Sequence, residues 1–253
     1  MIDTERLART IEDMVQPDRG ILAADESIPT ITKRFAALGI ESTPENRRAW
    51  RTLLFTAPEI QKYLSGVILF EETLDQTDDQ GTPLPDVLAQ RGIVPGIKTD
   101  RGLRNMPEAE GEKITAGLDD LAERLPAYRD KGARFTKWRN VFVIGHAKPG
   151  RVARHSNAEV LARQAVLAQH AGLVPIVEPE VLLDGDHSLE DCARATEHVL
   201  HAVFHALHFH GVLLEYCILK PSMVLPGKDS GQTATPEEVA EATLRVFKRT
   251  VPA

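Results

Sequence analysis

The sequence predicts an α/β fold with parallel strands, organised as a barrel rather than as an open sheet. Apolar runs of strand length alternate with helical periodicity six times, which is typical of a parallel α/β fold. Each apolar run ends in an ionisable residue, and the carboxyl ends of parallel strands are where such folds build their sites. The first strand is followed by no Gly-x-Gly-x-x-Gly segment, and the chain has no Gly-Lys-Ser/Thr loop. Nucleotide-binding open sheets are therefore disfavoured, and a barrel is favoured.

The six expected strands are short and rich in aliphatic side chains. They cover residues 21–24, 66–70, 93–97, 133–136, 173–177 and 213–220. The last run is apolar enough to indicate a strand buried on both faces. The residues at the carboxyl ends of the six runs are Asp25, Glu71, Lys98, Lys137, Glu178 and Lys220.

The helices between the strands are expected from apolar residues that recur with a helical period. They cover residues 3–15, 44–56, 118–131, 156–171, 188–209 and 236–248. Ser156 and Glu159 have the spacing of a capping box, and Pro126 is expected to kink its helix or mark its end. Thr43 and Thr235 are each followed by proline and are expected N-caps. No low-complexity linker interrupts the chain, so we expect residues 1–253 to form a single domain.

Lys220 ends the last apolar run and is followed by Pro221. At the end of a buried strand its ammonium is expected to lie near apolar walls, which disfavour the charged form. A partly neutral amine is a nucleophile toward carbonyls. The alternative is a lysine that only marks where the strand meets water.

Three of the strand ends repeat a spacing of two residues. The pairs are Lys98 with Asp100, Lys137 with Arg139, and Glu178 with Glu180. Residues two apart in a strand point to the same face, so basic and acidic side chains would interleave around a barrel mouth. Such a cluster can keep one lysine neutral and supply the acids and bases that imine chemistry needs. The competing interpretation is a set of salt bridges that closes the end of the barrel.

Charge and composition exclude several classes of protein. The formal net charge of −7 argues against general binding to nucleic acids or anionic membranes, although a local basic site for a phosphorylated metabolite remains compatible with it. The two cysteines, Cys192 and Cys217, lie in periodic or apolar segments and are expected to be reduced. We find no apolar signal segment at the N-terminus and no run of transmembrane length, and we therefore expect a cytoplasmic protein.

Four histidines form a stripe with helical spacing: His198, His201, His205 and His208. The spacing of His201 and His205 suits a shared metal ion. No cysteine or carboxylate nearby completes such a site, and the helix is expected on the outside of the barrel. A solvated or half-buried helix face is therefore favoured over a metal site.

Six segments stand in the order and spacing of one enzyme family. They are Gly20-Ile-Leu-Ala-Ala-Asp-Glu-Ser27, Gly66-Val-Ile-Leu-Phe70, Gly96-Ile-Lys98, Phe135-Thr-Lys-Trp-Arg139, Val174-Pro-Ile-Val-Glu-Pro-Glu180 and Leu219-Lys-Pro221. Together they resemble the class I (Schiff-base) fructose-bisphosphate aldolases. The resemblance implies a TIM (β/α)8-type barrel, of which this chain contains six of eight βα units. It also implies reversible cleavage of fructose 1,6-bisphosphate to dihydroxyacetone phosphate and glyceraldehyde 3-phosphate, without a metal or other cofactor.

The resemblance also implies roles for individual residues. Lys220 would form the imine with the ketose carbonyl, and Glu178 would be the general acid and base in forming and hydrolysing it. Asp25 would handle the hydroxyl proton as the carbon–carbon bond breaks. The remaining matched residues would position the intermediate (Lys137 and Glu180), support the site (Lys98 and Arg139) or hold the distal phosphate (Lys33 and Arg34).

The sequence departs from the family in two places. The segment Ser27-Ile-Pro-Thr30 replaces a Ser-Thr-Gly-Ser-like stretch that many members carry. The chain also ends at Ala253, before the family's seventh and eighth strands, its Ser-Gly-Gly loop, a phosphate-binding arginine and a mobile tail. We therefore expect a part of a longer protein, which as a full-length homotetramer would be an aldolase, whereas this chain alone would be weakly active or inactive.

Three other interpretations remain open at this point. One is another Schiff-base aldolase, of the transaldolase or sugar-acid type. A second is a non-catalytic interaction protein that retains an aldolase-like body, and a third is a metal-dependent aldolase that uses the histidine stripe. Trapping of an imine with borohydride separates them, because only the Schiff-base enzymes become labelled on a lysine.

Overall fold

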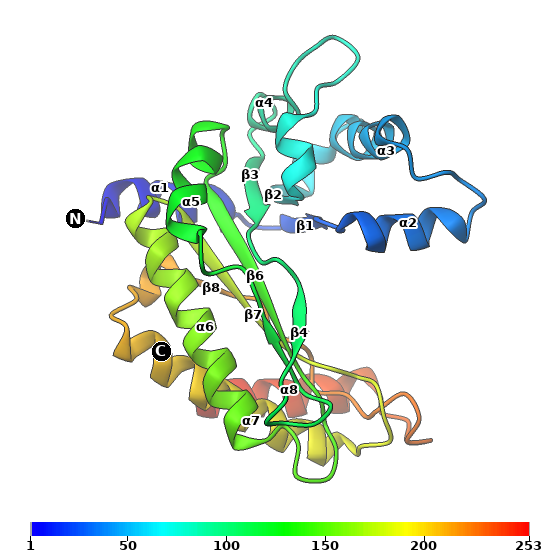
Figure 1. Ribbon diagram of the computed structural model, residues 1–253, viewed down its shortest axis with the longest axis vertical. Helices are drawn as coiled ribbons and strands as arrows, with labels where there is room; N and C mark the ends of the chain where they lie inside the picture. Colours follow the sequence, from blue (N-terminus) through cyan, green and yellow to red (C-terminus); the bar gives the residue numbers. More distant parts are fainter. Residues whose placement is uncertain (1, 253) are drawn as a thin grey trace. The chain divides into compact units, whose positions relative to one another are not determined.

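The computed structural model describes residues 2–252 and contains one main parallel sheet. Its strands are β1 (Gly20–Ala24), β2 (Leu64–Leu69), β3 (Val94–Lys98), β6 (Phe135–Phe142), β7 (Val174–Val181) and β8 (Ile218–Leu219). They lie in the order β1-β2-β3-β6-β7-β8, which is also their order along the chain (Figure 1). Parallel strands in chain order, joined by helices, confirm the predicted α/β class.

The chain divides into two compact units. The first comprises the residues up to Thr99 together with Asp120–Lys137 and Ala168–Pro175. The second comprises Asp100–Asp119, Trp138–Leu167 and the residues from Ile176 onward. β6 and β7 each contribute residues to both units.

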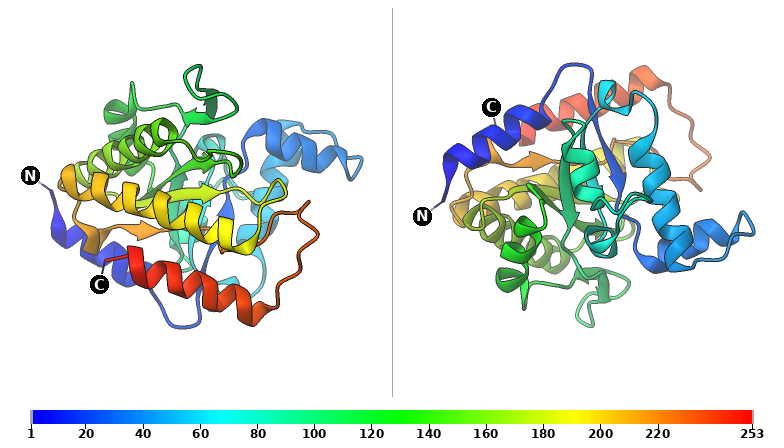
Figure 2. Two further views of the ribbon diagram at one scale, coloured as in Figure 1. Left: turned by 90° about the horizontal axis from the view of Figure 1, so that it is seen from below. Right: turned by 90° about the horizontal axis from the view of Figure 1, so that it is seen from above.

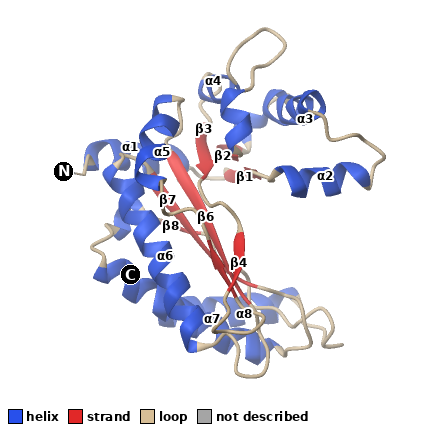
Figure 3. Cartoon of the chain, in the orientation of Figure 1, coloured by secondary structure: helices blue, strands red, loops and turns tan. Residues whose placement is uncertain are grey.

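The first unit packs three of its helices, α3, α4 and α5, against one face of its strands. Its helices are α1 (Thr4–Met14), α2 (Ile28–Ala36), α3 (Pro44–Thr56), α4 (Leu84–Ala89) and α5 (Leu121–Asp130), with 3-10 turns η1 (Ile60–Lys62) and η2 (Glu71–Asp75). Figure 3 shows α2 and α3 as separate helices joined by a loop. Val67, Leu69 and Ile97 point from the strands into a buried cluster that contains Phe55 of α3 and Leu88 of α4. Burial of this apolar surface is the main force that holds the helices on the sheet.

The opposite face of the same strands carries a space that an aromatic ring fills. In the register of the sheet, Gly66 of β2 lies beside Val94, and Gly96 of β3 lies beside Phe135 of β6. A Cβ atom on Gly96 would lie 2.2 Å from the Phe135 ring, and one on Gly66 would lie 3.4 Å from it. Phe135 is fully buried. The Phe135 ring therefore occupies a space that is free only because Gly96 has no side chain.

The second unit places long helices beside the carboxyl halves of β6 and β7. It contains most of α6 (Arg151–His170) and all of α7 (Leu189–Phe209), η3 (Leu214–Tyr216) and α8 (Pro236–Thr250). α8 runs along α7 (Figure 2). A small antiparallel hairpin, β4 (Leu103–Asn105) with β5 (Lys113–Thr115), completes the unit.

The expected strand over residues 213–220 is wrong in extent. Leu214–Tyr216 forms a 3-10 turn, and only Ile218–Leu219 is a strand, with both residues partly buried. Aliphatic character marked the run as buried, but a 3-10 turn has no distinctive period in three residues. β8 is consequently much shorter than β6 and β7, which have eight residues each.

Two helix boundaries also differ from the prediction. α6 begins at Arg151, so Ser156 lies inside the helix and the capping box expected from Ser156 and Glu159 is wrong. Glu159 instead pairs with His210, whose Nε2 lies 2.7 Å from its carboxylate. Pro126 lies inside α5, which continues to Asp130, so the proline does not mark the end of that helix.

The other capping predictions are confirmed. Thr43 accepts a hydrogen bond from the backbone N–H of Asn46 at the start of α3. Thr235 and Glu238 form a reciprocal capping box on α8. In the part of the chain that the structure describes, no helix is both long and apolar enough to cross a membrane.

Candidate active site

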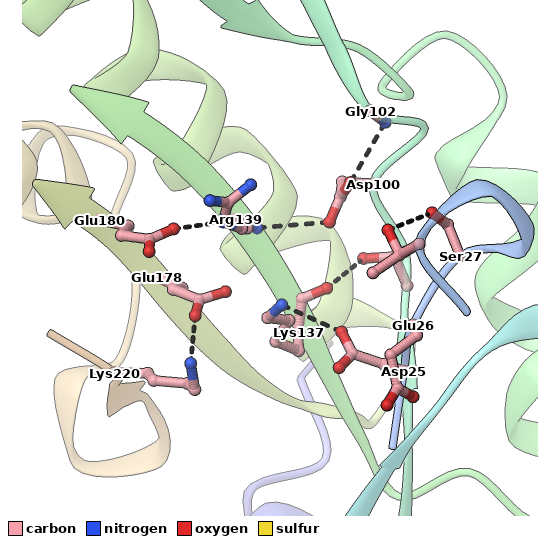
Figure 4. Close-up of polar contacts among 12 residues, drawn as sticks. Asp25, Glu26, Ser27, Asp100, Gly102, Lys137, Arg139, Glu178, Glu180 and Lys220 are labelled. Carbon is pink, nitrogen blue, oxygen red and sulfur yellow. Dashed lines mark hydrogen bonds and ion pairs between the residues drawn. The ribbon is translucent and has the colours of Figure 1, made fainter. Parts of the chain in front are cut away.

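In the first unit, Asp25 and Lys137 form a buried ion pair. Asp25 follows the last residue of β1, and Lys137 is the third residue of β6. The Lys137 Nζ donates a hydrogen bond to the Asp25 Oδ2 over 3.0 Å (Figure 4). Their side chains are only 6% and 11% exposed. Two of the predicted catalytic residues are therefore in contact away from bulk water, where opposite charges interact more strongly.

The Asp25–Lys137 contact also reports the curvature of the sheet in this unit. β2 and β3 lie between β1 and β6. Neighbouring strands are about 4.8 Å apart, so a flat sheet would hold β1 and β6 about 14 Å apart. Side chains that stand perpendicular to a flat sheet would not meet across that distance. The strands of this unit must therefore curl toward the face that carries Asp25 and Lys137, as the wall of a barrel does.

Lys98 lies beside Lys137 in the sheet. It is the last residue of β3 and the register partner of Lys137, and it is half-buried. Lys98 makes polar contacts of its own. The backbone N–H of Thr99 donates to the carbonyl oxygen of Lys137, which continues the pairing of the two strands. The predicted support residue is thus adjacent to the Asp25–Lys137 pair.

In the second unit, Lys220 contacts Glu178. The backbone N–H of Lys220 donates to the carbonyl oxygen of Val177, which places Lys220 beside Glu178 of β7. The Lys220 ammonium pairs with the Glu178 carboxylate (Figure 4). Glu178 is 6% exposed, and a cavity of about 270 Å³ is lined by Glu178, Glu180 and Lys220 among others. The predicted nucleophile and the predicted general acid/base are therefore in direct contact beside a cavity.

The surroundings of Lys220 differ from those expected. Its side chain is 42% exposed, and its ammonium contacts a carboxylate rather than apolar walls. The short β8 explains the difference, because a two-residue strand does not bury its ends. A neutral amine at this site therefore requires that a proton pass to a neighbouring base.

A second ion pair in the same unit joins Arg139 and Glu180. The Arg139 guanidinium pairs with the Glu180 carboxylate across β6 and β7, as the spacing of two residues predicted (Figure 4). The backbone N–H of Arg139 donates to Asp100 over 3.4 Å, and the Thr115 hydroxyl donates to the Arg139 carbonyl over 2.8 Å. The β4–β5 hairpin thereby holds this part of β6. Both partners of the ion pair are about one-third exposed, so the pair is accessible to an anionic ligand.

The predicted phosphate-binding pair, Lys33 and Arg34, lies on α2 and is exposed. Arg34 pairs with Glu26, the residue that follows Asp25. The segment that departs from the family at residues 27–30 forms the start of this helix. The basic pair is therefore carried by a regular helix whose last turn is tied to the end of β1.

Sequence reasoning missed a group of charged residues that α3 holds in ion pairs. Arg51 of α3 lies 2.9 Å from the Glu26 carboxylate, and its side chain is 4% exposed. Arg47, one helical turn earlier, forms a bidentate pair with Glu72. Burial lowers the pKa of the Arg51 guanidinium, and the charge of Glu26 opposes this shift. The spacing of four residues between Arg47 and Arg51 puts both on one helix face and was the available signal.

The histidine stripe lies on α7, and all four of its side chains are exposed. Among the residues that the structure describes, no group of three or more His, Cys, Asp or Glu side chains is arranged to hold a metal ion. The expected solvated helix face agrees with this exposure. Cys192 and Cys217 are both free.

Comparison with known proteins decides the family. The family model described as class I fructose-bisphosphate aldolase ("Glycolytic") matches residues 6–253. The chain belongs to the class I fructose-bisphosphate aldolases. Members of this family are lyases, and the main sheet is the corresponding TIM (β/α)8-type fold with six of its strands in this chain.

Several relatives of this aldolase are similar over nearly its whole length. It is 52% identical to cytosolic fructose-bisphosphate aldolase 7 of Arabidopsis thaliana, covering 98% of this chain and 69% of the relative. It is 50% identical to a probable class 1 aldolase of Xanthomonas campestris, covering 98% and 75%. Among solved structures, the Plasmodium falciparum aldolase in complex with TRAP and a small-molecule inhibitor is 50% identical. That superposition has a TM-score of 0.96 and covers 98% of this chain and 72% of the other.

Proposed function

We propose that this aldolase reversibly cleaves fructose 1,6-bisphosphate to dihydroxyacetone phosphate and glyceraldehyde 3-phosphate through an imine on Lys220. The observation that carries the proposal is the contact between Lys220 and the buried carboxylate of Glu178 beside a cavity. A lysine with a proton acceptor already in place is the arrangement that imine formation needs. The names of the relatives support the substrate.

Imine formation begins with transfer of a proton from the Lys220 ammonium to Glu178. The neutral amine then adds to the ketose carbonyl carbon and gives a carbinolamine. Glu178 returns the proton to the departing hydroxyl, which leaves as water, and a protonated imine remains. Contact between Lys220 and Glu178 supports this shuttle, because general acid/base groups must lie within hydrogen-bond reach of the proton they move.

Carbon–carbon cleavage follows from the charge of the protonated imine. The imine withdraws electrons from the adjacent carbons, so the bond breaks to give an enamine rather than a free carbanion. We assign to Asp25 the removal of the hydroxyl proton that releases the aldehyde. Lys137 supports this assignment, because its ammonium lies 3.0 Å from the Asp25 Oδ2 and holds the carboxylate in a fixed position.

The other basic residues are proposed to bind and position the substrate. Glu180 and Lys137 would orient the intermediate, and Arg139 and Lys98 would support the site. Lys33 and Arg34, exposed on α2, would hold the distal phosphate. Guanidinium and ammonium groups suit phosphate oxygens because they offer several charged donors.

Borohydride trapping tests the imine directly. The chain is incubated with fructose 1,6-bisphosphate or dihydroxyacetone phosphate and reduced, and peptide mass spectrometry locates the label. We expect labelling on Lys220 that a chelator does not prevent. Lys220→Met should abolish the label, and Glu178→Gln should slow labelling by roughly 10²–10⁴-fold.

Matched controls distinguish the site from a general effect of charge. Lys228, which pairs with Asp184 and is exposed, is another lysine of the second unit. Lys228→Met should leave the label on Lys220 unchanged. A label on a different lysine, or none in the presence of substrate, would refute the proposal.

Turnover, location and assembly complete the proposed function. The weak or absent turnover predicted for the 253-residue chain is measured by coupled assay, and rates comparable with those of an intact aldolase would contradict it. We propose a cytoplasmic location because the plant relatives are named cytosolic. The homotetramer that the resemblance implies for the full-length protein stays a prediction, and sedimentation equilibrium measures it.

A further inference from the structure

A second cavity of the second unit lies apart from all of the residues proposed for catalysis. Its volume is about 480 Å³. Its walls come from the loop of residues 144–149 after β6, from the first turn of α6, and from residues 186–198 at the start of α7. This volume is in the range of cavities that hold small metabolites.

His187 is the buried polar side chain in the wall of this cavity. It is 6% exposed. Neither of its ring nitrogens has a hydrogen-bond partner among residues 2–252. A buried polar group without a partner costs free energy, and most such groups in folded proteins are paired. Both nitrogens are shielded from solvent in the present ring orientation, so a ligand in the cavity would provide the missing partner once the ring turns a nitrogen toward it.

The charges around His187 define the kind of ligand. The wall contains three cationic side chains, Lys148, Arg154 and Arg194, and two carboxylates, Asp186 and Asp191, so it has one more cation than carboxylate. Asp191 accepts hydrogen bonds from Ser188 and pairs with Arg194. Arg154 donates to the carbonyl oxygen of Pro149, a neutral group that does not compensate its charge. The positive charge that remains therefore favours an anion.

We propose that this cavity binds a small organic phosphate of metabolite size. In this arrangement the His187 ring hydrogen-bonds to the ligand, and Arg154 and Lys148 pair with the phosphate oxygens. The site is independent of the imine chemistry, because neither Lys220 nor Glu178 lines it.

The test follows the His187 ring during a titration with glycerol 3-phosphate, which has no carbonyl group and forms no imine. Long-range proton–nitrogen spectra of the ¹⁵N-labelled chain resolve histidine ring signals, and His187→Gln assigns those of His187. We expect the His187 signals to shift saturably with glycerol 3-phosphate. Equal shifts with chloride at the same ionic strength would overturn the proposal, as would shifts confined to histidines outside the cavity wall, such as His201 and His205.

A pair of arginine variants tests the role of charge. Arg154→Ser removes a cation from the cavity wall, and we expect it to weaken binding of glycerol 3-phosphate about tenfold. Arg151 also lies in the first turn of α6 but is exposed and outside the cavity, so Arg151→Ser should leave the affinity unchanged. Equal affinities of the two variants would refute the site. Imine trapping on Lys220 should be normal in both, which separates failure here from failure of the proposed catalysis.

Discussion

The positions of Lys98 and Lys137, the two predicted site lysines of the first unit, depend on a residue that has no side chain. Phe135, Lys137 and Arg139 share one face of β6 because they are two residues apart. The ring of Phe135 lies over Gly96, and Lys98 and Lys137 follow two residues later on the same strands. An aromatic ring thus fills the space directly below the charged groups. Glycine is needed at position 96 for packing and not for backbone conformation, because this residue lies in an extended strand that any residue can adopt.

Gly96→Ala is expected to destabilise the fold because the new methyl group would lie 2.2 Å from the Phe135 ring. Overpacking in a buried site costs about 1–3 kcal/mol, and a contact this short should give a value near the upper end. Urea unfolding measures the change in the free energy of unfolding. Phe135→Leu in the same chain should recover part of the loss, so the double variant should be more stable than the sum of the single changes.

Gly20→Ala is the matched control for this prediction. Gly20 is also a strand glycine, but a Cβ atom there would have no neighbour within 4 Å. We expect this change to be neutral or to stabilise slightly, since alanine reduces the entropy of the unfolded chain. If both glycine variants lose the same stability, the contact with Phe135 is not the cause.

At the residue scale, the sequence predicted which side chains share a face but not what surrounds them. The spacing of two residues correctly paired Arg139 with Glu180. It contained no information on the buried partner of Glu26, because Arg51 lies on a helix about 25 residues away in the chain. The apolar walls expected around Lys220 were also wrong, since they depended on a strand that is only two residues long.

At the scale of the element, α7 begins with a capping box whose strength depends on ionisation. Ser188 accepts a hydrogen bond from the backbone N–H of Asp191, and the Asp191 carboxylate accepts from the Ser188 backbone N–H and hydroxyl. These hydrogen bonds, with the charge of Arg194, lower the pKa of Asp191. A carboxyl group whose pKa is lower in the folded state stabilises the fold above its unfolded pKa of about 3.9. That contribution is lost as the pH falls through the folded pKa.

Asp191→Asn is therefore expected to cost about 0.5–1 kcal/mol of stability at neutral pH. The difference from the parent chain should stay constant above about pH 5 and shrink toward zero as the parent's carboxylate becomes protonated. Urea unfolding at several pH values measures it. Glu190→Gln, a neighbouring acid outside the box, is the control, and a pH-independent cost of Asp191→Asn would contradict the argument.

The sequence predicted the presence of long or well-capped helices better than it predicted their first and last residues. Both ends of α7 matched, because Ser188 caps its start and Gly211, with a positive φ of 69°, follows its end. α6 was placed five residues too late because Ser156 and Glu159 imitate a capping box inside a continuous helix. The nine-residue α2 was not anticipated, because no helix was expected between residues 15 and 44.

At the scale of the whole molecule, we propose that residues 1–253 form one barrel domain although they cluster into two units. β6 and β7 supply residues to both units, so neither unit contains all of its own strands. Separate unfolding of one unit would break two strands in the middle. We therefore expect a single transition in urea when tryptophan fluorescence and far-UV circular dichroism are compared.

Cysteine reactivity offers a second probe of the same cooperativity. Cys192 is fully buried, and burial raises the pKa of its thiol, so it should react with thiol reagents only after unfolding. The Cys192 reaction should follow the same urea transition as the optical signals. Two transitions, or labelling of Cys192 before the fluorescence changes, would show that the units unfold independently.

The ion pair of Asp25 and Lys137 has a consequence for how the enzyme fails. The two side chains can meet only if the sheet curves between β1 and β6, so the distance between them depends on that curvature. A substitution in β2 or β3 that flattened this part of the sheet would move Asp25 away from Lys137 without changing either residue. The catalysis proposed for these residues would then be lost through a change in sheet geometry alone, although both side chains would still be present.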